Sequence, residues 1–114
     1  MIGVMATLSR ILSIVIVTLL SGCGETKPVE TSLAALAESQ VHFNGRLVRV
    51  SGTLRTFDEP RHYWIENEDL DRVALEGRDD LAARVGQDVE VVGTFKYSRN
   101  TGRKIEVRQL TQVE

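Results

Sequence analysis

The chain has 114 residues, of which 42% are apolar and 26% are charged, and this length and mixture suit one small globular domain. Its net charge of −2 argues against an overall positive field that would attract nucleic acid. Cys23 is the only cysteine, and His42 and His62 are the only histidines. The sequence therefore excludes an internal disulfide and a cysteine-based metal site, and we expect no metal or free cofactor.

An uncharged apolar segment lies close to the start of the chain. Residues 11–20, ILSIVIVTLL, follow Arg10 and contain no charged side chain. An export signal needs an apolar core of roughly 7 to 15 residues, whereas a membrane-spanning helix needs roughly 20. We therefore predict that residues 1–22 form a signal peptide.

The next segment is Leu20-Ser21-Gly22-Cys23, which resembles the lipobox of bacterial lipoproteins. The resemblance implies that the Cys23 thiol receives diacylglycerol, and that Cys23 becomes the N-terminus and is then N-acylated, as with palmitate. Two or more acyl chains hold a protein stably on a membrane. In enteric bacteria an aspartate after the cysteine retains a lipoprotein at the inner membrane, so Gly24 implies a periplasm-facing protein of the outer membrane. The alternative is a plain signal peptide or a short buried helix with a chance cysteine.

Residues 23–31 are polar and contain Pro28, so we predict a lipidated tether there. The mature chain from residue 23 has 13 Lys and Arg against 16 Asp and Glu, a charge of −3. Residues 32–114 are predicted to hold a short helix followed by one folded domain. The helix covers residues 31–43, with Thr31 or Ser32 as its cap and an apolar face of four residues: Leu33, Leu36, Ala37 and Val41.

Alternating apolar residues predict strands over most of the remaining chain. The expected strands are residues 46–57, 62–66, 72–77, 87–98 and 104–113, with one or two helical turns at 79–86, where Asp79 or Asp80 is the cap and Leu81 and Val85 share a face. Gly52 and Gly93 interrupt the first and fourth strands and indicate sharp bends. Residues 57–61 are predicted to be a loop, and 66–71 a solvated acidic loop that lacks the glycine and glutamate positions of a calcium loop.

This order of three strands, a helix and two strands resembles the OB-fold, a five-stranded Greek-key barrel. The phrases LVRVSGTL and DVEVVGTF are similar to strands 1 and 4 of small exported OB-fold lipoproteins, and the resemblance covers residues 45 to 113. We therefore expect an all-β protein with short helices, a five-stranded OB-fold-like barrel after a short N-terminal helix. The alternative is an SH3-like small barrel.

The resemblance implies a ligand-binding face on strands 2 and 3, rimmed by two loops. Carried onto this chain, the face comprises Arg55, His62, Trp64 and Arg72, and the rim comprises Tyr97, Arg99, Arg103 and Lys104. With Ile65 inward, alternation places Trp64 outside; a shift of one residue would place Tyr63 there instead. The alternative is that Trp64 belongs to the core and the cations form cross-strand ion pairs.

Catalysis finds little support, because His62 has no evident partner and no nucleophile set stands out. We therefore expect no enzyme, but a membrane-anchored envelope lipoprotein whose OB-like domain is a non-catalytic binding or adaptor module for a protein or glycan partner. The alternative is a nucleic-acid-binding OB-fold protein, which the exported location and the negative net charge disfavour.

Overall fold

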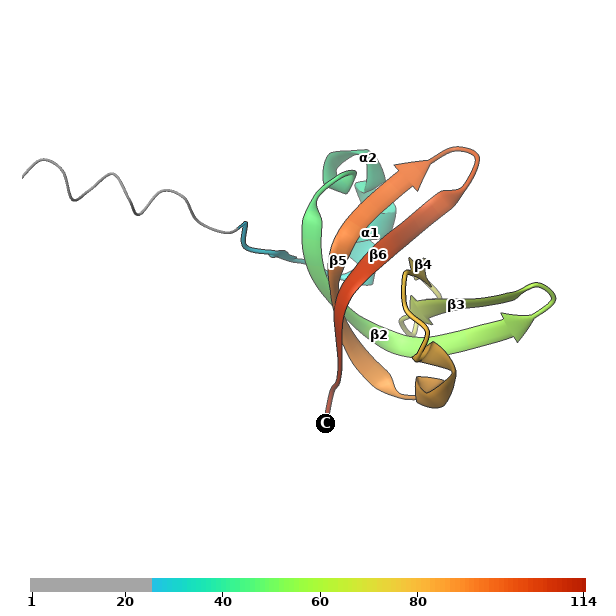
Figure 1. The fold of residues 1–114 in the computed structure, drawn as a ribbon. Helices are drawn as coiled ribbons and strands as arrows, with labels where there is room; N and C mark the ends of the chain where they lie inside the picture. The colour runs from blue at the N-terminus through green and yellow to red at the C-terminus, as the bar shows by residue number, and fades with distance from the viewer. Residues whose placement is uncertain (1–25) are drawn as a thin grey trace, which may run out of the picture.

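The computed structural model describes residues 26–114 of the chain. The predicted signal peptide, Cys23 and Gly24 lie outside these described residues, so the lipid anchor stays a prediction. Figure 1 shows the arrangement of the elements. In chain order they are β1 (Val29–Glu30), α1 (Leu33–Glu38), α2 (Gln40–Phe43), β2 (Leu47–Asp58), β3 (Arg61–Glu66), β4 (Arg72–Glu76), η3 (Leu81–Arg84), β5 (Asp88–Ser98) and β6 (Gly102–Gln112).

Five strands close into a ring in the order β2, β3, β4, β6, β5, and β5 pairs back with β2. The β4–β6 pair is parallel, while the other four pairs of the ring are antiparallel. Closure removes the exposed edges that an open sheet of this size would carry. The predicted OB-like barrel is confirmed.

A sixth strand, β1, lies within the predicted tether. Val29 pairs with Val48 and Glu30 with Arg49, both in parallel register with β2. The Arg49 guanidinium lies 3.6 Å from the Glu30 carboxylate, and the Thr31 N–H donates to the Arg49 carbonyl at 3.0 Å. The tether prediction for residues 23–31 is therefore corrected at its C-terminal end, because these backbone bonds dock residues 29–31 onto the barrel.

The predicted helix over residues 31–43 is two short helices, which meet at Ser39. The Ser32 hydroxyl caps α1 by accepting the Ala35 N–H at 3.1 Å. Leu33 and Leu36 are buried in the core, but Val41 is 77% exposed. The expectation that Val41 shares their face is wrong, because the break at Ser39 ends the helical periodicity.

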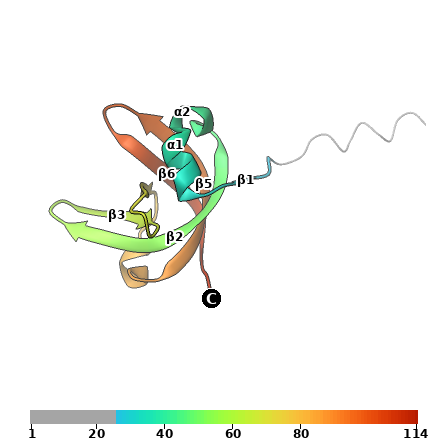
Figure 2. The ribbon, with the colours of Figure 1, turned by 180° about the vertical axis from the view of Figure 1, so that it is seen from behind.

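The helical segment predicted at residues 79–86 is shorter than expected and is a 3₁₀ turn, η3. Leu81 is buried, whereas Val85 lies beyond η3 and is 39% exposed. Asp80 does not cap η3 with its side chain. Its carboxylate instead accepts two hydrogen bonds from Arg78, at 2.8 and 2.6 Å, which lower the pKa of Asp80 to about 2. Figures 1 and 2 show α1 and η3 at opposite ends of the barrel.

The barrel core is formed by the inward residues of every strand of the ring, together with leucines of α1 and η3. The core includes these alternating residues, all at most 5% exposed: Val48, Val50, Val73, Leu75, Val89, Val91 and Ile105.

The predicted loop at 57–61 shrinks to a two-residue turn at 59–60, because β2 and β3 pair as far as Asp58 and Arg61.

Both predicted bends fall at points where another strand comes close. The β5–β6 register shifts between Val92 and Gly93. A Cβ at Gly93 would collide with the Glu106 carbonyl oxygen and lie 2.6 Å from Ile105 Cγ2. Gly52 lies where β2 passes from β5 to β3, and a Cβ there would meet Leu33 Cδ1 at 2.9 Å. Glycine is therefore required at these positions for packing space.

Candidate functional site

Two hairpins, β2–β3 and β5–β6, project from the same side of the barrel in both views (Figures 1 and 2). A hollow of about 440 Å³ is lined by residues of β3, β4, β5, β6, α2 and the β5–β6 turn. We call it the basic cleft, and its lining residues are Gln40, His62, Trp64, Arg72, Ala74, Tyr97, Ser98, Arg99, Gly102 and Arg103.

Three arginines and no carboxylate line the basic cleft. Arg103 is held in place, since its Nε donates to the Arg72 carbonyl at 3.2 Å and its Nη1 to Gln40 Oε1 at 3.1 Å. Arg99 is exposed on the β5–β6 turn. Among residues 26–114, neither Arg99 nor Arg103 forms an ion pair with a carboxylate. Both guanidinium groups therefore keep their charge available to an anionic ligand.

Aromatic rings continue from the basic cleft along the β2–β3 hairpin. The rings of Trp64 and His62 lie 5.1 Å apart, tilted by 30°, and those of His62 and Phe57 lie 6.2 Å apart. The Arg72 guanidinium carbon is 4.9 Å from the centroid of the Trp64 ring, within the range of a cation–π contact. We call Phe57, His62 and Trp64 the aromatic row. Flat rings beside cations can stack planar groups and hold anions.

Strand alternation explains why Trp64 faces outward. Ile65 is fully buried, and Tyr63 packs against the core as a partly buried residue. The predicted orientation, with Tyr63 inward and Trp64 outward, is confirmed, and the register shifted by one residue is excluded. Trp64 pairs with Ala74 on β4. Arg72 lies two residues before Ala74 on the same strand, so its side chain projects from the same face as Trp64.

Glu66, at the end of β3, joins several of these groups. Its Oε1 accepts the Trp64 indole N–H at 2.9 Å, and its Oε2 accepts the Arg55 Nε–H at 3.3 Å. The Arg72 Nη2 lies 4.0 Å from Oε1. The hydrogen bond from Trp64 is the main cause that lowers the pKa of Glu66, with the Arg55 guanidinium adding to it. Glu66 is therefore held as a carboxylate at neutral pH.

The structure brings together six of the eight residues predicted for the face and its rim: His62, Trp64, Arg72, Tyr97, Arg99 and Arg103. The expected places of Arg55 and Lys104 are corrected. Arg55 is paired across the strands with Trp64, but its guanidinium turns to Glu66. Lys104 alternates with Arg103 on β6, so it faces away and pairs with Glu76 at 3.3 Å.

Sequence reasoning missed Gln40, Phe57 and Glu66 as members of this region. Glu66 was accessible in principle, because alternation in β3 places it on the same face as His62 and Trp64. Phe57 became a neighbour of His62 because the hairpin turn is shorter than predicted. Gln40 gave no local signal, since its contact with Arg103 spans 63 residues.

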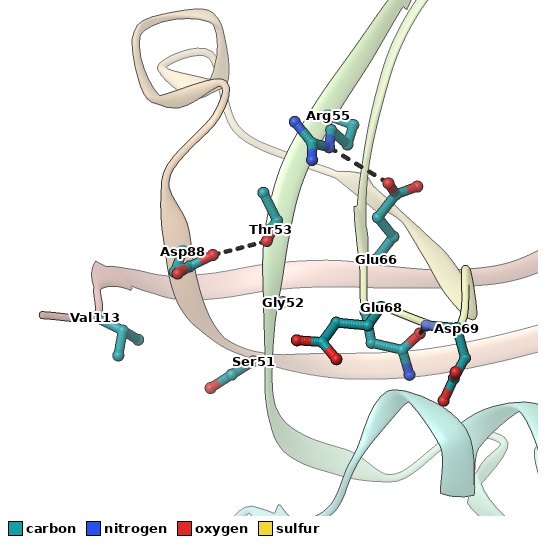
Figure 3. A pocket seen from close by; sticks show the side chains of 10 residues that line it. Ser51, Gly52, Thr53, Arg55, Glu66, Glu68, Asp69, Asp88 and Val113 are labelled. Atoms are coloured by element: carbon teal, nitrogen blue, oxygen red, sulfur yellow. Dashed lines mark hydrogen bonds and ion pairs between the residues drawn. The ribbon is translucent and has the colours of Figure 1, made fainter.

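A second hollow, of about 560 Å³, lies around the middle of β2 and has the opposite charge. We call it the acidic hollow; it is lined by Ser51, Gly52, Thr53, Arg55, Glu66, Asn67, Glu68, Asp69, Asp88 and Val113. Figure 3 shows Asp88 on one side of β2, where it accepts the Thr53 hydroxyl at 2.7 Å, and Glu66, Glu68 and Asp69 on the other. Four carboxylates and one arginine line it. Residues 66–69 of the predicted acidic loop line the hollow, and Glu68 and Asp69 are exposed to solvent as expected.

The described part of the chain has neither a metal-binding cluster nor a helix suited to a bilayer. In residues 26–114, no set of three or more His, Cys, Asp or Glu side chains is arranged to hold a metal ion. No helix in that same range has the length and apolar character needed to cross a bilayer.

Comparison with known proteins identifies similar folds. No model of a known protein family matches the chain, and no curated protein sequence matches it either. A structure of replication protein A from U. maydis bound to ssDNA is similar with a TM-score of 0.55 and 19% identity, over 80% of this chain and 77% of that one. A putative aspartyl-tRNA synthetase from Leishmania major Friedlin is similar with a TM-score of 0.51 and 11% identity, over 82% of this chain but only 22% of the synthetase.

These likenesses support the OB-like fold and correct the functional expectation. The sequence predicted an adaptor for a protein or glycan partner and argued against nucleic acid. The comparison contradicts that prediction, because the similar structure is one of replication protein A bound to ssDNA. The physical reason is that net charge sums over the whole chain. Here four carboxylates line the acidic hollow, while the charged side chains that line the basic cleft are arginines.

Proposed function

We propose that this domain binds single-stranded nucleic acid in the basic cleft and along the aromatic row. The observation that carries the proposal is the gathering of Arg72, Arg99 and Arg103 beside Trp64 and Tyr97, in a hollow without a carboxylate in its lining. The similarity to a structure of replication protein A bound to ssDNA supports it.

The chemistry of the cleft fits an unpaired strand better than a duplex. Single-strand binding combines cations that follow the backbone with rings on which bases stack, because every base has an aromatic face. His62 is exposed, and Phe57 is 59% exposed at the hairpin end, so the aromatic row is open to solvent. In a duplex the bases are stacked on each other and would not reach these rings. The proposed ligand is therefore an oligonucleotide with free bases.

Salt dependence of binding tests the proposal. A fluorescent 12-nucleotide single strand, as DNA and as RNA, is titrated with the protein at several salt concentrations. Each neutralised phosphate contributes roughly 0.7 to the slope of log affinity against log salt on a single strand, so the two arginines that would face the backbone, Arg99 and Arg103, predict a slope of about −1.4. A duplex of the same sequence should bind more weakly. Absence of saturable binding to either single strand at low salt would overturn the proposed function.

Arg49 provides a matched control for this titration. It lies on β2 and pairs with Glu30 at 3.6 Å and Glu90 at 3.5 Å, away from the cleft. Arg99→Ala should reduce the magnitude of the salt slope by about 0.7, whereas Arg49→Ala should leave it unchanged. Equal effects of the two variants would mean that the charge is sensed over the whole protein and not in the basic cleft.

We also propose, from the sequence alone, that lipid on Cys23 holds the domain at a membrane surface. The support is the segment Leu20-Ser21-Gly22-Cys23 after a ten-residue apolar run. Cell fractionation tests it: the wild-type protein should sediment with membranes, and Cys23→Ser should not. Membrane retention of Cys23→Ser would contradict the anchor, with no consequence for the proposed ligand.

A further inference from the structure

We propose that Glu66 is a positioning residue that fixes Trp64 and Arg72 as a preformed surface for a nucleobase. This inference rests on the proposed function and assigns a role to a carboxylate that at first sight opposes it. A negative charge beside a site for a polyanion is unfavourable unless it does something else there. The contacts of Glu66 indicate what that is.

The carboxylate holds the indole by its only polar atom. The Trp64 Nε1–H donates to Glu66 Oε1 at 2.9 Å, and the Glu66 side chain is only 15% exposed. Both residues are on β3, two positions apart, so they project from one face of the same strand. The hydrogen bond fixes how the indole plane lies on the sheet.

The same carboxylate also steadies the cation over that plane. Arg72 Nη2 lies 4.0 Å from Glu66 Oε1, while the Arg72 guanidinium carbon lies 4.9 Å from the Trp64 ring centroid. On its other side Glu66 Oε2 accepts Arg55 Nε–H at 3.3 Å, the contact drawn in Figure 3. Glu66 is thus held from both sides and cannot turn away without losing a partner.

Fixing these groups in advance lowers the ordering cost that binding would otherwise carry. The negative charge also repels phosphate at this end of the aromatic row, so the ligand backbone is directed to Arg99 and Arg103 on the other hairpin. Glu66 therefore favours a base, and not a phosphate, beside Trp64.

The test compares an intact single strand with one of equal length and charge that lacks bases. Both are titrated into the full-length chain and its variants, and the ratio of the two affinities reports stacking. The wild-type ratio should be at least about 5, the lower end for one stacked base. Glu66→Ala should bring the ratio close to 1, because the indole and Arg72 lose their common partner. Glu66→Gln should restore most of the ratio, since its amide oxygen still accepts the Trp64 N–H.

Glu106→Ala is the matched control. The Glu106 side chain pairs with Lys96 at 2.9 Å and is not among the lining residues of the basic cleft, yet its loss changes the net charge equally. The NMR resonance of the Trp64 indole N–H in the free protein should shift in Glu66→Ala and stay in place in Glu106→Ala.

Three contrary results are distinguishable. An unchanged ratio in Glu66→Ala, with wild-type discrimination intact, would overturn the role of Glu66 and leave the proposed function standing. Failure of the wild-type protein to bind either strand would overturn both. Equal loss in Glu66→Ala and Glu66→Gln, in folded proteins, would overturn positioning through the indole hydrogen bond.

Discussion

The basic cleft and the acidic hollow lie on one small barrel and use neighbouring strands, yet they differ in charge and in contents. The basic cleft has three arginines, no carboxylate and exposed rings at its edge. The acidic hollow has four carboxylates against one arginine, and no tryptophan, tyrosine, phenylalanine or histidine in its lining. The larger hollow is therefore not the better site for an anionic ligand. Volume alone does not identify function; the type of side chain that the fold directs into a hollow does.

Glu66 is where the two regions meet. It lines the acidic hollow and accepts the indole N–H of Trp64, a lining residue of the basic cleft. Trp64, which lines the basic cleft, and Glu66, which lines the acidic hollow, are only two positions apart on β3. The separation of the two regions therefore depends on the direction in which single side chains point. The following predictions test how separate they are.

Gly93→Val should damage both regions together, because both depend on the closed barrel. Its Cβ would meet the Glu106 carbonyl oxygen, a backbone atom that cannot move aside cheaply. We expect a loss of about 3 kcal/mol in the free energy of unfolding, the upper end for an overpacked core, measured by urea denaturation. Gly52→Ala should cost less, since its closest contact is the end of the flexible Leu33 side chain at 2.9 Å. The reverse order would contradict the packing described for the two strand bends.

Reversing charge in the basic cleft should abolish most binding, while neutralising charge in the acidic hollow should not. Arg99→Glu with Arg103→Glu should lower the affinity for a single strand by roughly 100-fold or more, because each charged hydrogen bond contributes about 1.5 to 3 kcal/mol. Glu68→Gln with Asp69→Asn, measured by the same fluorescence titration, should change affinity by less than about 3-fold at 0.15 M salt. Similar effects in both double variants would remove the distinction between the regions.

Trp64→Ala should separate stacking from charge within the basic cleft. Loss of one base–ring stack costs about 1 to 3 kcal/mol, so affinity should fall roughly 5- to 100-fold. The salt slope should remain near its wild-type value, since no cation is removed. A changed slope with unchanged affinity at low salt would indicate that Trp64 supports the arginines and does not contact the ligand.

Acid should weaken the hydrogen bond between Trp64 and Glu66, which joins the two regions. The folded pKa of Glu66 is lowered, mainly by the Trp64 hydrogen bond, so its contribution to stability is complete above the unfolded pKa of about 4.3. That contribution should be lost as pH falls below about 4 and through the lowered folded pKa. The Trp64 indole N–H resonance should therefore stay constant from pH 7 to about 5 and move only below that. Movement of this resonance between pH 7 and about 5 would contradict its control by the Glu66 carboxylate.

Alternation and glycine placement made much of the barrel predictable. The inward residues of each strand, the bends at Gly52 and Gly93, and the outward turn of Trp64 follow from a period of two and from the need for space. The docking of β1 was not predictable from a local pattern, because it depends on the pairing of Val29 and Glu30 with Val48 and Arg49. The two misplaced site residues, Arg55 and Lys104, have the residue type expected of a binding site but turn to Glu66 and Glu76.

Local patterns thus determine which residues are inside this barrel and which are outside, because burial follows the repeat of a strand. They also carry the lipid-anchor prediction at Cys23, which depends on sequence alone. The tertiary structure decided which of the outward residues expected from the OB-fold resemblance share a surface and which, like Arg55 and Lys104, turn to other partners. Arg72, Arg99 and Arg103 come from β4, the β5–β6 turn and β6, and the closure of the ring brings them to one cleft beside Trp64. A net charge of −2 could not reveal this, since a sum over the chain contains no information on where its charges meet.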